Sequence, residues 1–102
     1  MVSKYRARPV IIDGIRFASQ REGKRYSELK LLQKAGHIRG LEMQTPFPIH
    51  INGVKCFTYL ADFYYSRNGQ LVLEDVKGVR TPMYRLKKKC VEAAYNIKIT
   101  EI

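Results

Sequence analysis

Two acidic residues and a lysine directly follow an aliphatic run in the stretch LVLEDVKG, residues 71–78. The aliphatic run is typical of a buried strand, whereas charged side chains are seldom placed at the end of such a strand unless they are paired or bind a metal. Side chains alternate between the two faces of a strand, so Asp75 and Lys77 are predicted to project to one side and Glu74 to the other. A β-bulge before Lys77 would shift this register and exchange the two acids.

A further acid, Asp62, lies in the stretch LADFY, on a run that a turn at Asn68-Gly69 would place beside residues 71–78. Neighbouring strands can then bring Asp62 and Asp75 close together, and two like charges at that distance favour a divalent cation between them. Hard oxygen ligands without a nearby cysteine or histidine suit Mg²⁺ or Mn²⁺. A lysine beside the metal can orient a water or stabilise charge on a phosphate. Composition and spacing leave a second interpretation open, a satisfied Asp–Lys ion pair at the end of a strand.

The elements that would position these residues follow from turns, caps and periodicity. Asp13-Gly14 between two β-like runs predicts a hairpin. Ser19 can cap a helix that continues with apolar residues at helical spacing and stops at Gly36. Alternation and turn residues predict four strands, over residues 38–44, 47–53, 55–65 and 70–78, with Asn52-Gly53 as a tight turn.

A second helix is predicted to open at Thr81-Pro82, with proline at its first position. Residues 96–102 close the chain as an alternating strand, so the order of elements predicts one mixed α/β domain over residues 1–102, a central mixed sheet flanked by two main helices. In the second helix we expect an apolar stripe of Met83, Leu86, Cys90 and Ala94, and a polar face with Arg85, Lys88 and Lys89.

The charge balance points to a polyanionic partner. Nineteen Lys and Arg against nine Asp and Glu give a formal net charge of +10 over 102 residues, and a domain this basic usually meets nucleic acid. A merely soluble basic protein is the alternative. No apolar stretch approaches the roughly 20 residues that cross a bilayer, and the basic segment 1–9 lacks the apolar run of a signal peptide. Two cysteines, Cys56 and Cys90, are too few for a disulfide scaffold or a zinc site and are expected to be buried thiols.

Several motifs together resemble a known family. IDGIRF, RYSELKLLQKAG, LEMQ, YLADF, EDVKG and LKKK are spread over nearly the whole chain, roughly residues 5 to 102. They resemble a phage- and prophage-borne family of small proteins in the PD-(D/E)xK nuclease superfamily, related to Holliday-junction resolvases and phage endonuclease I. The resemblance implies a restriction-endonuclease-like core of helix, three-stranded meander, helix and strand.

The resemblance also implies roles for individual residues. Asp62, Asp75 and Lys77 match the acid and acid-x-Lys positions, and Glu22 matches a further acid on the first helix. The three acids would hold Mg²⁺ or Mn²⁺, either one ion or two. Glu22 has an alternative role, because Ser19 to Glu22 also form a capping box in which its carboxylate would bond back to the Ser19 amide. Gly23 stands where the family tends to have alanine. Gln44 matches a family position as a possible secondary site residue, with a structural role at a strand end as the alternative.

The function expected from this resemblance is that of a metal-dependent DNA endonuclease acting on branched or structured DNA. We expect the enzyme to be a homodimer. We also expect it to be encoded by a phage or prophage and to be located in the cytoplasm of a bacterial host. The alternative class is a non-catalytic nucleic-acid-binding or host-interaction protein on a nuclease scaffold, and an enzyme acting on RNA differs in substrate only. Contacts with DNA phosphates are expected from five basic residues, Arg80, Arg85, Lys87, Lys88 and Lys89. The alternative interpretation is that these residues only form a solvated helix face.

Overall fold

Strands and helices are distributed along the chain much as the turn and cap residues predict. The computed structural model describes residues 8–102, so segment 1–9 lies almost wholly outside the described residues. Within residues 8–102, two helices and six strands follow one another in the order β1 (Val10–Ile12), β2 (Ile15–Phe17), α1 (Gln20–Lys34), β3 (Arg39–Ile51), β4 (Val54–Arg67), β5 (Gln70–Asp75), α2 (Pro82–Tyr95) and β6 (Ile99–Glu101).

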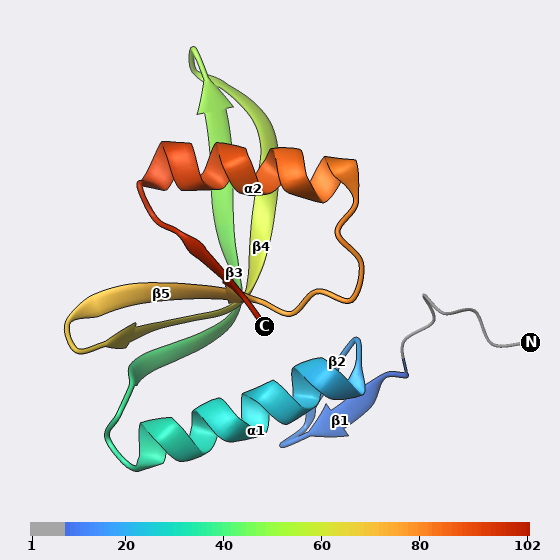
Figure 1. Ribbon diagram of the computed structural model, residues 1–102, viewed down its shortest axis with the longest axis vertical. Helices are drawn as coiled ribbons and strands as arrows, with labels where there is room; N and C mark the ends of the chain where they lie inside the picture. Colours follow the sequence, from blue (N-terminus) through green and yellow to red (C-terminus); the bar gives the residue numbers. More distant parts are fainter. Residues whose placement is uncertain (1–7) are drawn as a thin grey trace, which may run out of the picture.

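A mixed four-stranded sheet in the order β3-β4-β5-β6 forms the centre of the fold (Figure 1). β3, β4 and β5 form an antiparallel meander, and β6 pairs in parallel with β5. A parallel pair needs a crossover connection, which α2 provides. β1 and β2 form a separate hairpin that turns at Asp13 and Gly14. The predicted α/β class, with a mixed sheet and two main helices, is confirmed.

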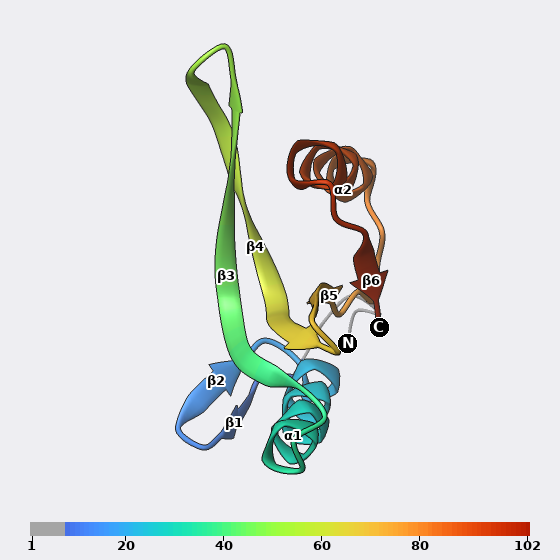
Figure 2. The same ribbon diagram turned by 90° about the vertical axis from the view of Figure 1, so that its left-hand side faces the viewer.

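β3 and β4 form one long hairpin that extends beyond the rest of the molecule (Figures 1 and 2). It turns at Asn52-Gly53, as predicted. The prediction of two short strands over residues 38–44 and 47–53 is wrong, because β3 is continuous. β3 lies at the edge of the sheet, where Pro46 and Pro48 are tolerated because their missing amide donors are not needed by a further strand.

The long hairpin is interrupted at Gln44 and Asp62, which lie opposite each other between two regular pairs of the β3–β4 ladder. Gln44 has a φ of 54°, in the left-handed region, so the regular pleat breaks at this point. Towards the tip, Tyr59 packs in the core beneath α2, whereas Phe63 and Tyr65 pack in a second core with α1 and the β1–β2 hairpin. One strand thus serves two cores, and the interruption marks their junction.

Helix α1 begins at a side-chain cap and packs closely on the β1–β2 hairpin. Ser19 Oγ accepts a hydrogen bond from the Glu22 amide at 3.1 Å, as the capping pattern predicts. Gly23 faces the hairpin, and a Cβ there would lie 2.6 Å from Val10 Cγ1 and 3.0 Å from Ile12 Cδ1. Glycine costs a helix about 1 kcal/mol relative to alanine, and here the close approach of the hairpin requires it.

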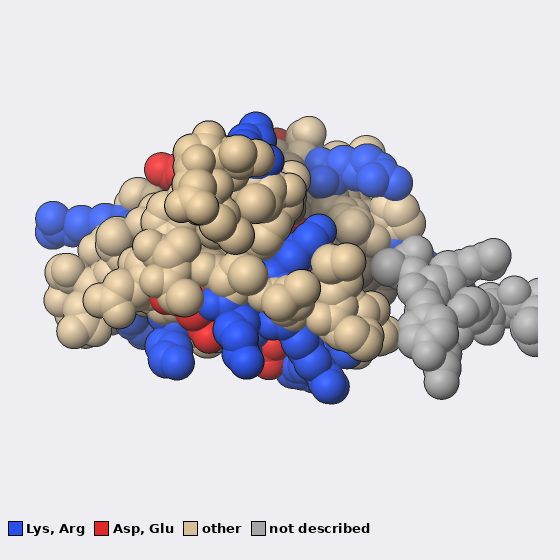
Figure 3. Space-filling model, turned by 90° about the horizontal axis from the view of Figure 1, so that it is seen from above, with Lys and Arg blue, Asp and Glu red and all other residues tan. Residues whose placement is uncertain are grey.

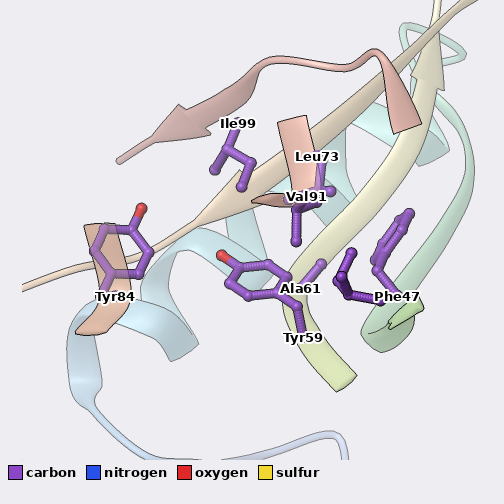
Figure 4. Close-up of a cluster of buried hydrophobic side chains, with 8 residues drawn as sticks. Phe47, Tyr59, Ala61, Leu73, Tyr84, Val91 and Ile99 are labelled. Carbon is purple, nitrogen blue, oxygen red and sulfur yellow. The ribbon is translucent and has the colours of Figure 1, made fainter. Parts of the chain in front are cut away.

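Helix α2 is capped by Thr81 and covers the tip-side half of the β3–β4 hairpin (Figure 2). Tyr84 and Val91 are its buried residues, and Figure 4 shows them among the side chains of the core beneath the helix. The predicted apolar stripe is wrong, because Met83 and Leu86 are 59% and 56% exposed and Ala94 is also exposed, with only Cys90 half-buried. The helix is rotated so that the Tyr84 ring fills the core near the end of β5.

The face of the β3–β4 hairpin turned away from α2 is uncovered. Leu60 on this face is 53% exposed, whereas Ile51 and its partner Val54 are exposed at the tip on the opposite face, in line with Ile49. Both cysteines are free, and the prediction that both are buried is wrong for Cys56, which is exposed near the tip of the hairpin. The hairpin therefore presents apolar side chains to its surroundings.

Candidate active site

Three acids and a lysine from separate segments come together at the interruption of the β3–β4 hairpin. Asp62 lies on β4, Asp75 ends β5, Lys77 follows two residues later and Glu22 lies in the first turn of α1. They form a continuous chain of contacts in which Gln44 links Glu22 to Asp62, Asp62 contacts Asp75, and Asp75 contacts Lys77. The structure thus brings together all five residues that the sequence singled out for this site.

Asp75 is the most buried acid of the cluster, with 1% of its surface exposed. Its Oδ2 accepts a hydrogen bond from Tyr59 Oη at 2.5 Å and lies 3.4 Å from Lys77 Nζ. Burial, the hydrogen bond with Asp62 and repulsion from that carboxylate together raise the pKa of Asp75 to about 7, although Tyr59 and Lys77 act in the opposite direction. Near neutral pH this carboxyl group can therefore hold or release a proton.

Asp62 joins β4 to the segment that follows β5. Its Oδ2 accepts a hydrogen bond from the Val76 amide at 2.7 Å, and its Oδ1 lies 3.4 Å from Gln44 Nε2. Burial raises the pKa of Asp62, and the neighbouring Glu22 raises it further, against hydrogen bonds from Asp75 and Val76 that lower it. Asp62 and Asp75 are thus two partly desolvated carboxyl groups that lie close enough to influence each other's pKa.

Glu22 faces the acidic cluster, and its predicted capping-box bond goes to the Ala18 amide instead of the Ser19 amide. Its Oε1 accepts a hydrogen bond from the Ala18 amide at 3.2 Å, one residue before the Ser19 amide that the capping-box pattern predicts. Its Oε2 lies 3.4 Å from Gln44 Nε2 and so faces the cluster. The capping contact fixes the side chain of this buried acid and turns its other oxygen towards Asp62.

Gln44 combines an unusual backbone conformation with a position between two acids. A left-handed φ costs a non-glycine residue roughly 1–2 kcal/mol, and such residues cluster at functional sites. The Gln44 amide group donates to both Glu22 and Asp62 at 3.4 Å. Gln44 therefore belongs to the site and is more than the end of a strand.

Glu74 lies on the opposite face of β5, as strand alternation predicts. It forms two hydrogen bonds with Arg25, Nε to Oε1 at 2.8 Å and Nη2 to Oε2 at 2.6 Å, and accepts a third from Tyr65 Oη. This paired arrangement raises the pKa of Arg25. Asp75 thus lies beside Lys77 with Glu74 opposite, as predicted, although β5 ends at Asp75 and Lys77 lies in the connection that follows.

The donor set of the cluster suits a hard divalent cation. Among residues 8–102, no group of three or more His, Cys, Asp and Glu side chains is already arranged around a common metal position. Burial nevertheless raises the pKa values of Asp62 and Asp75, a bound cation would favour their ionised forms, and Glu22 adds a third carboxylate nearby. All the ligands are oxygens, which is the preference of Mg²⁺ and Mn²⁺.

The basic residues predicted to contact phosphates are arranged beside the cluster, and several already have partners. Arg80 Nε lies 2.8 Å and Lys88 Nζ 3.4 Å from the Glu101 carboxylate, and Lys87 Nζ lies over the Phe57 ring. Figure 3, which looks along the hairpin from its tip, shows Lys and Arg gathered along the margin of the molecule. An open hollow of about 310 Å³ in this region is lined by Arg80, Arg85, Lys88, Lys89, Glu92 and Glu101.

Sequence reasoning missed two tyrosines that contact the cluster. The Tyr59 hydroxyl group donates to Asp75. The Tyr84 ring centroid lies 4.5 Å from Lys77 Nζ. Tyr59 lies three residues before Asp62, so strand alternation places the two on opposite faces of β4 and gives no signal for this contact. No local pattern links Tyr84 to Lys77.

The fold and the cluster define a small α/β protein with an acid–lysine site at the end of its central strands. Over residues 2–102 the chain matches the family described as "Protein of unknown function (DUF1064)", and it belongs to that family. No curated protein matches the chain. Neither helix in the described part, residues 8–102, is long and apolar enough to cross a membrane.

Proposed function

We propose that the protein is a metal-dependent DNA endonuclease of the PD-(D/E)xK type, acting on branched or structured DNA. One observation carries the proposal: Glu22, Asp62, Asp75 and Lys77, from α1, β4, the end of β5 and the connection after it, form one chain of contacts through a strained Gln44. A structural ion pair at a strand end would need only Asp75 and Lys77. Three carboxyl groups held close together, two of them with raised pKa values, are costly for stability and are characteristic of a functional site.

In this proposal Asp62 and Asp75 hold the cation, Mg²⁺ or Mn²⁺, and Glu22 contributes directly or through a water. When bound, the cation would activate a water for attack on a phosphodiester and neutralise charge on the phosphorus oxygens. Tyr59 fixes Asp75 through its hydrogen bond to Oδ2. Lys77, on the same edge, would orient the attacking water or stabilise the charge that develops on the phosphate.

The DNA would lie over the basic surface beside the site. Arg80, Arg85 and Lys89 are exposed, and the net charge of +10 favours backbone contacts with little reading of bases. A symmetric junction requires two cuts, so we further propose a homodimer that supplies two active sites. A phage- or prophage-encoded protein working in the cytoplasm of a bacterial host fits such a substrate.

A cleavage assay tests the proposal. Labelled linear, flapped and four-way-junction DNA would be incubated with the protein and Mg²⁺, Mn²⁺ or EDTA, and we expect cleavage of branched DNA that requires the metal. Asp62→Asn should lower the rate by about a hundredfold or more while leaving DNA binding intact, because it removes one carboxylate of the cation site. Asp13→Asn, the same change in the β1–β2 turn, is the matched control and should cleave normally.

Calorimetric titration with Mg²⁺ adds a readout that does not depend on the substrate. The cation should bind the wild-type protein and raise its thermal stability by mass action, and Asp62→Asn should lose both effects. Unchanged metal affinity in Asp62→Asn would remove Asp62 from the site. DNA binding without cleavage under every metal condition would instead favour the non-catalytic nucleic-acid-binding alternative. Cleavage of RNA but not of DNA would change the proposed substrate from DNA to RNA.

A further inference from the structure

We infer that Tyr84 is a positioning residue for Lys77, whose ammonium group it holds against the Asp75 carboxyl group through the face of its ring. The inference rests on the proposed function for its catalytic meaning, because Lys77 is the residue that would act on the water or the phosphate. The contact itself can be tested without any cleavage assay. It links α2, which the sequence suggests only as a basic helix, to the chemistry at the end of β5.

The geometry around the lysine leaves its ammonium group between two partners. Lys77 Nζ lies 4.5 Å from the centroid of the Tyr84 ring and 3.4 Å from Asp75 Oδ2. A cation over an aromatic face is attracted by the quadrupole of the ring, and more strongly where water is partly excluded. The Lys77 side chain is half-buried, so the ring and the carboxyl group together define its direction.

Lys77 needs such a partner because its own backbone does not fix the side chain. Strand β5 ends at Asp75, and Lys77 lies in the connection to α2, outside any helix or strand. Its carbonyl oxygen accepts a hydrogen bond from Arg21 Nη1 at 3.2 Å, which ties down the main chain but not the ammonium group. A lysine side chain has four rotatable carbons and loses much rotamer freedom when it is held in one place.

Tyr84 is itself rigidly held, as a positioning residue must be. The residue is 7% exposed in the core beneath α2, where Figure 4 shows it at the same end as Tyr59. Its hydroxyl group donates to Glu101 Oε2 at 2.7 Å, and Arg80 and Lys88 hold the same carboxylate. The Tyr84 hydrogen bond is the main cause that lowers the pKa of Glu101 to about 2, so this anchor stays charged at physiological pH.

The arrangement also explains why α2 buries Tyr84 and leaves Leu86 and Met83 exposed. A helix oriented by hydrophobicity alone would bury its aliphatic stripe. Burying the tyrosine instead places an aromatic face beside Lys77 and a hydroxyl group beside Glu101. The ring and the hydroxyl group thus have separate partners, and separate substitutions can distinguish their roles.

NMR of the lysine side chain tests the contact directly. In ¹H–¹³C spectra of the wild-type protein, the Lys77 ε-methylene protons should lie upfield of those of the other lysines, because they sit over the ring. The signal is assigned by its loss in Lys77→Arg. Tyr84→Phe should keep the upfield shift, Tyr84→Leu should abolish it, and Tyr95→Leu, the same change at another tyrosine of α2, should keep it. A wild-type Lys77 signal among those of solvated lysines would overturn the inference without any variant being made.

Kinetics then tests the positioning role. Tyr84→Leu should lower kcat for cleavage about tenfold with KM nearly unchanged, because the lysine is displaced while the DNA surface stays intact. Tyr84→Phe should retain most of kcat, and Tyr95→Leu should remain within about twofold of the wild type. Equal losses in Tyr84→Phe and Tyr84→Leu would assign the effect to the hydroxyl group and overturn the role of the ring.

Failure of the proposed function has a different outcome. If the wild-type protein cleaves no DNA under any metal condition, the catalytic role of Lys77 and the positioning role of Tyr84 fall together, while the NMR shift still establishes or refutes the physical contact. If the wild type cleaves and Tyr95→Leu loses as much activity as Tyr84→Leu, general loosening of α2 explains the effect and the inference is wrong.

Discussion

At the scale of single residues, the site sets function against stability. Asp62 and Asp75 are two carboxyl groups held close together away from water, and Asp75 shares its Oδ2 between Tyr59 and Lys77. A protein without a use for this arrangement would gain stability by replacing one acid with a neutral side chain. The loss of stability caused by these two acids therefore supports the proposed site, and it can be measured.

The pKa of Asp75 predicts how the metal-free protein responds to pH. The folded-state pKa of about 7 lies above the ordinary value of 3.8, so the folded protein binds the extra proton between these values. The stability that the folded protein gains by binding this proton at Asp75 is fully present below about pH 4 and is lost as pH rises to about 7. In EDTA, Asp75→Asn should remove this dependence and raise the free energy of unfolding at pH 8 by about 2 kcal/mol, allowing for partial solvation and coupling. Thermal unfolding between pH 4 and 8 measures it, and a variant less stable than the wild type at pH 8 contradicts it.

Replacing Glu74 should lower stability, whereas replacing Asp75 should raise it. Its carboxylate is buried and paired with Arg25, so Glu74→Gln should lower the free energy of unfolding by roughly 2–4 kcal/mol, because the guanidinium group loses its charged partner. Cleavage by the folded fraction should continue, since Glu74 faces away from Lys77. Denaturant unfolding and the cleavage assay, run on the same preparations, separate the two effects. An inactive but stable Glu74→Gln protein would exchange the roles of the two acids.

At the scale of elements, local sequence signals predicted most helices and strands. They failed where contacts between distant segments determine which face of an element is buried. Strand alternation was enough to place Asp75 and Glu74 on opposite faces of β5, and cap residues were enough to start both helices at Ser19 and Thr81. The buried face of α2 was mispredicted, because it depends on how Tyr84 meets residues of β4 and β6 far away in the chain. The contacts of Tyr59 and Tyr84 with the site were missed for the same reason.

The packing of α1 on the β1–β2 hairpin gives a prediction at this scale. Gly23→Ala should gain about 1 kcal/mol of helix propensity, but its Cβ would meet Val10 Cγ1 at 2.6 Å, and overpacking of this kind costs roughly 1–3 kcal/mol. We expect a net loss of stability, measured by chemical unfolding. Val10→Ala in the same chain removes the clashing methyl group and should make Gly23→Ala favourable relative to Val10→Ala alone. If Gly23→Ala stabilises the otherwise unchanged protein, the hairpin does not pack where the structure has it.

At the scale of the whole molecule, charge and apolar surface are segregated. Residues 45–60, the tip-side part of the long hairpin, include one Lys and no Arg, Asp or Glu in a chain with a net charge of +10. Basic side chains lie along the margins of the molecule (Figure 3), and four of them line the hollow beside α2 and Glu101. Two different partners are expected for two such surfaces.

The basic surface predicts a salt dependence. Among residues 8–102, Arg85 and Lys89 form no ion pair within the protein and are exposed beside the site. Changing both to Gln should make the slope of log affinity against log salt shallower by up to about 2, since each duplex phosphate contact contributes about 0.9. Lys34→Gln with Arg39→Gln, the same charge change at the far end of α1, is the control and should leave the slope closer to that of the wild type. Equal slopes for both double variants would show that Arg85 and Lys89 are merely solvated.

The tip-side part of the long hairpin, with its single Lys, is the predicted interface between two copies of the chain. Two chains of charge +10 repel each other over most of their surface, so a homodimer must form through a surface that carries little charge. The tip-side part of the long hairpin, with Leu60 on one face and Val54 and Ile51 on the other, is such a surface, and its exposed apolar side chains would be buried by a second copy. Light scattering should give twice the monomer mass of 11.9 kDa for the wild type and the monomer mass for Leu60→Glu. Leu31→Glu, at an apolar position on α1 that is 69% exposed against 53% for Leu60, should remain dimeric. A wild-type monomer both free and on branched DNA would argue against paired cuts at a junction.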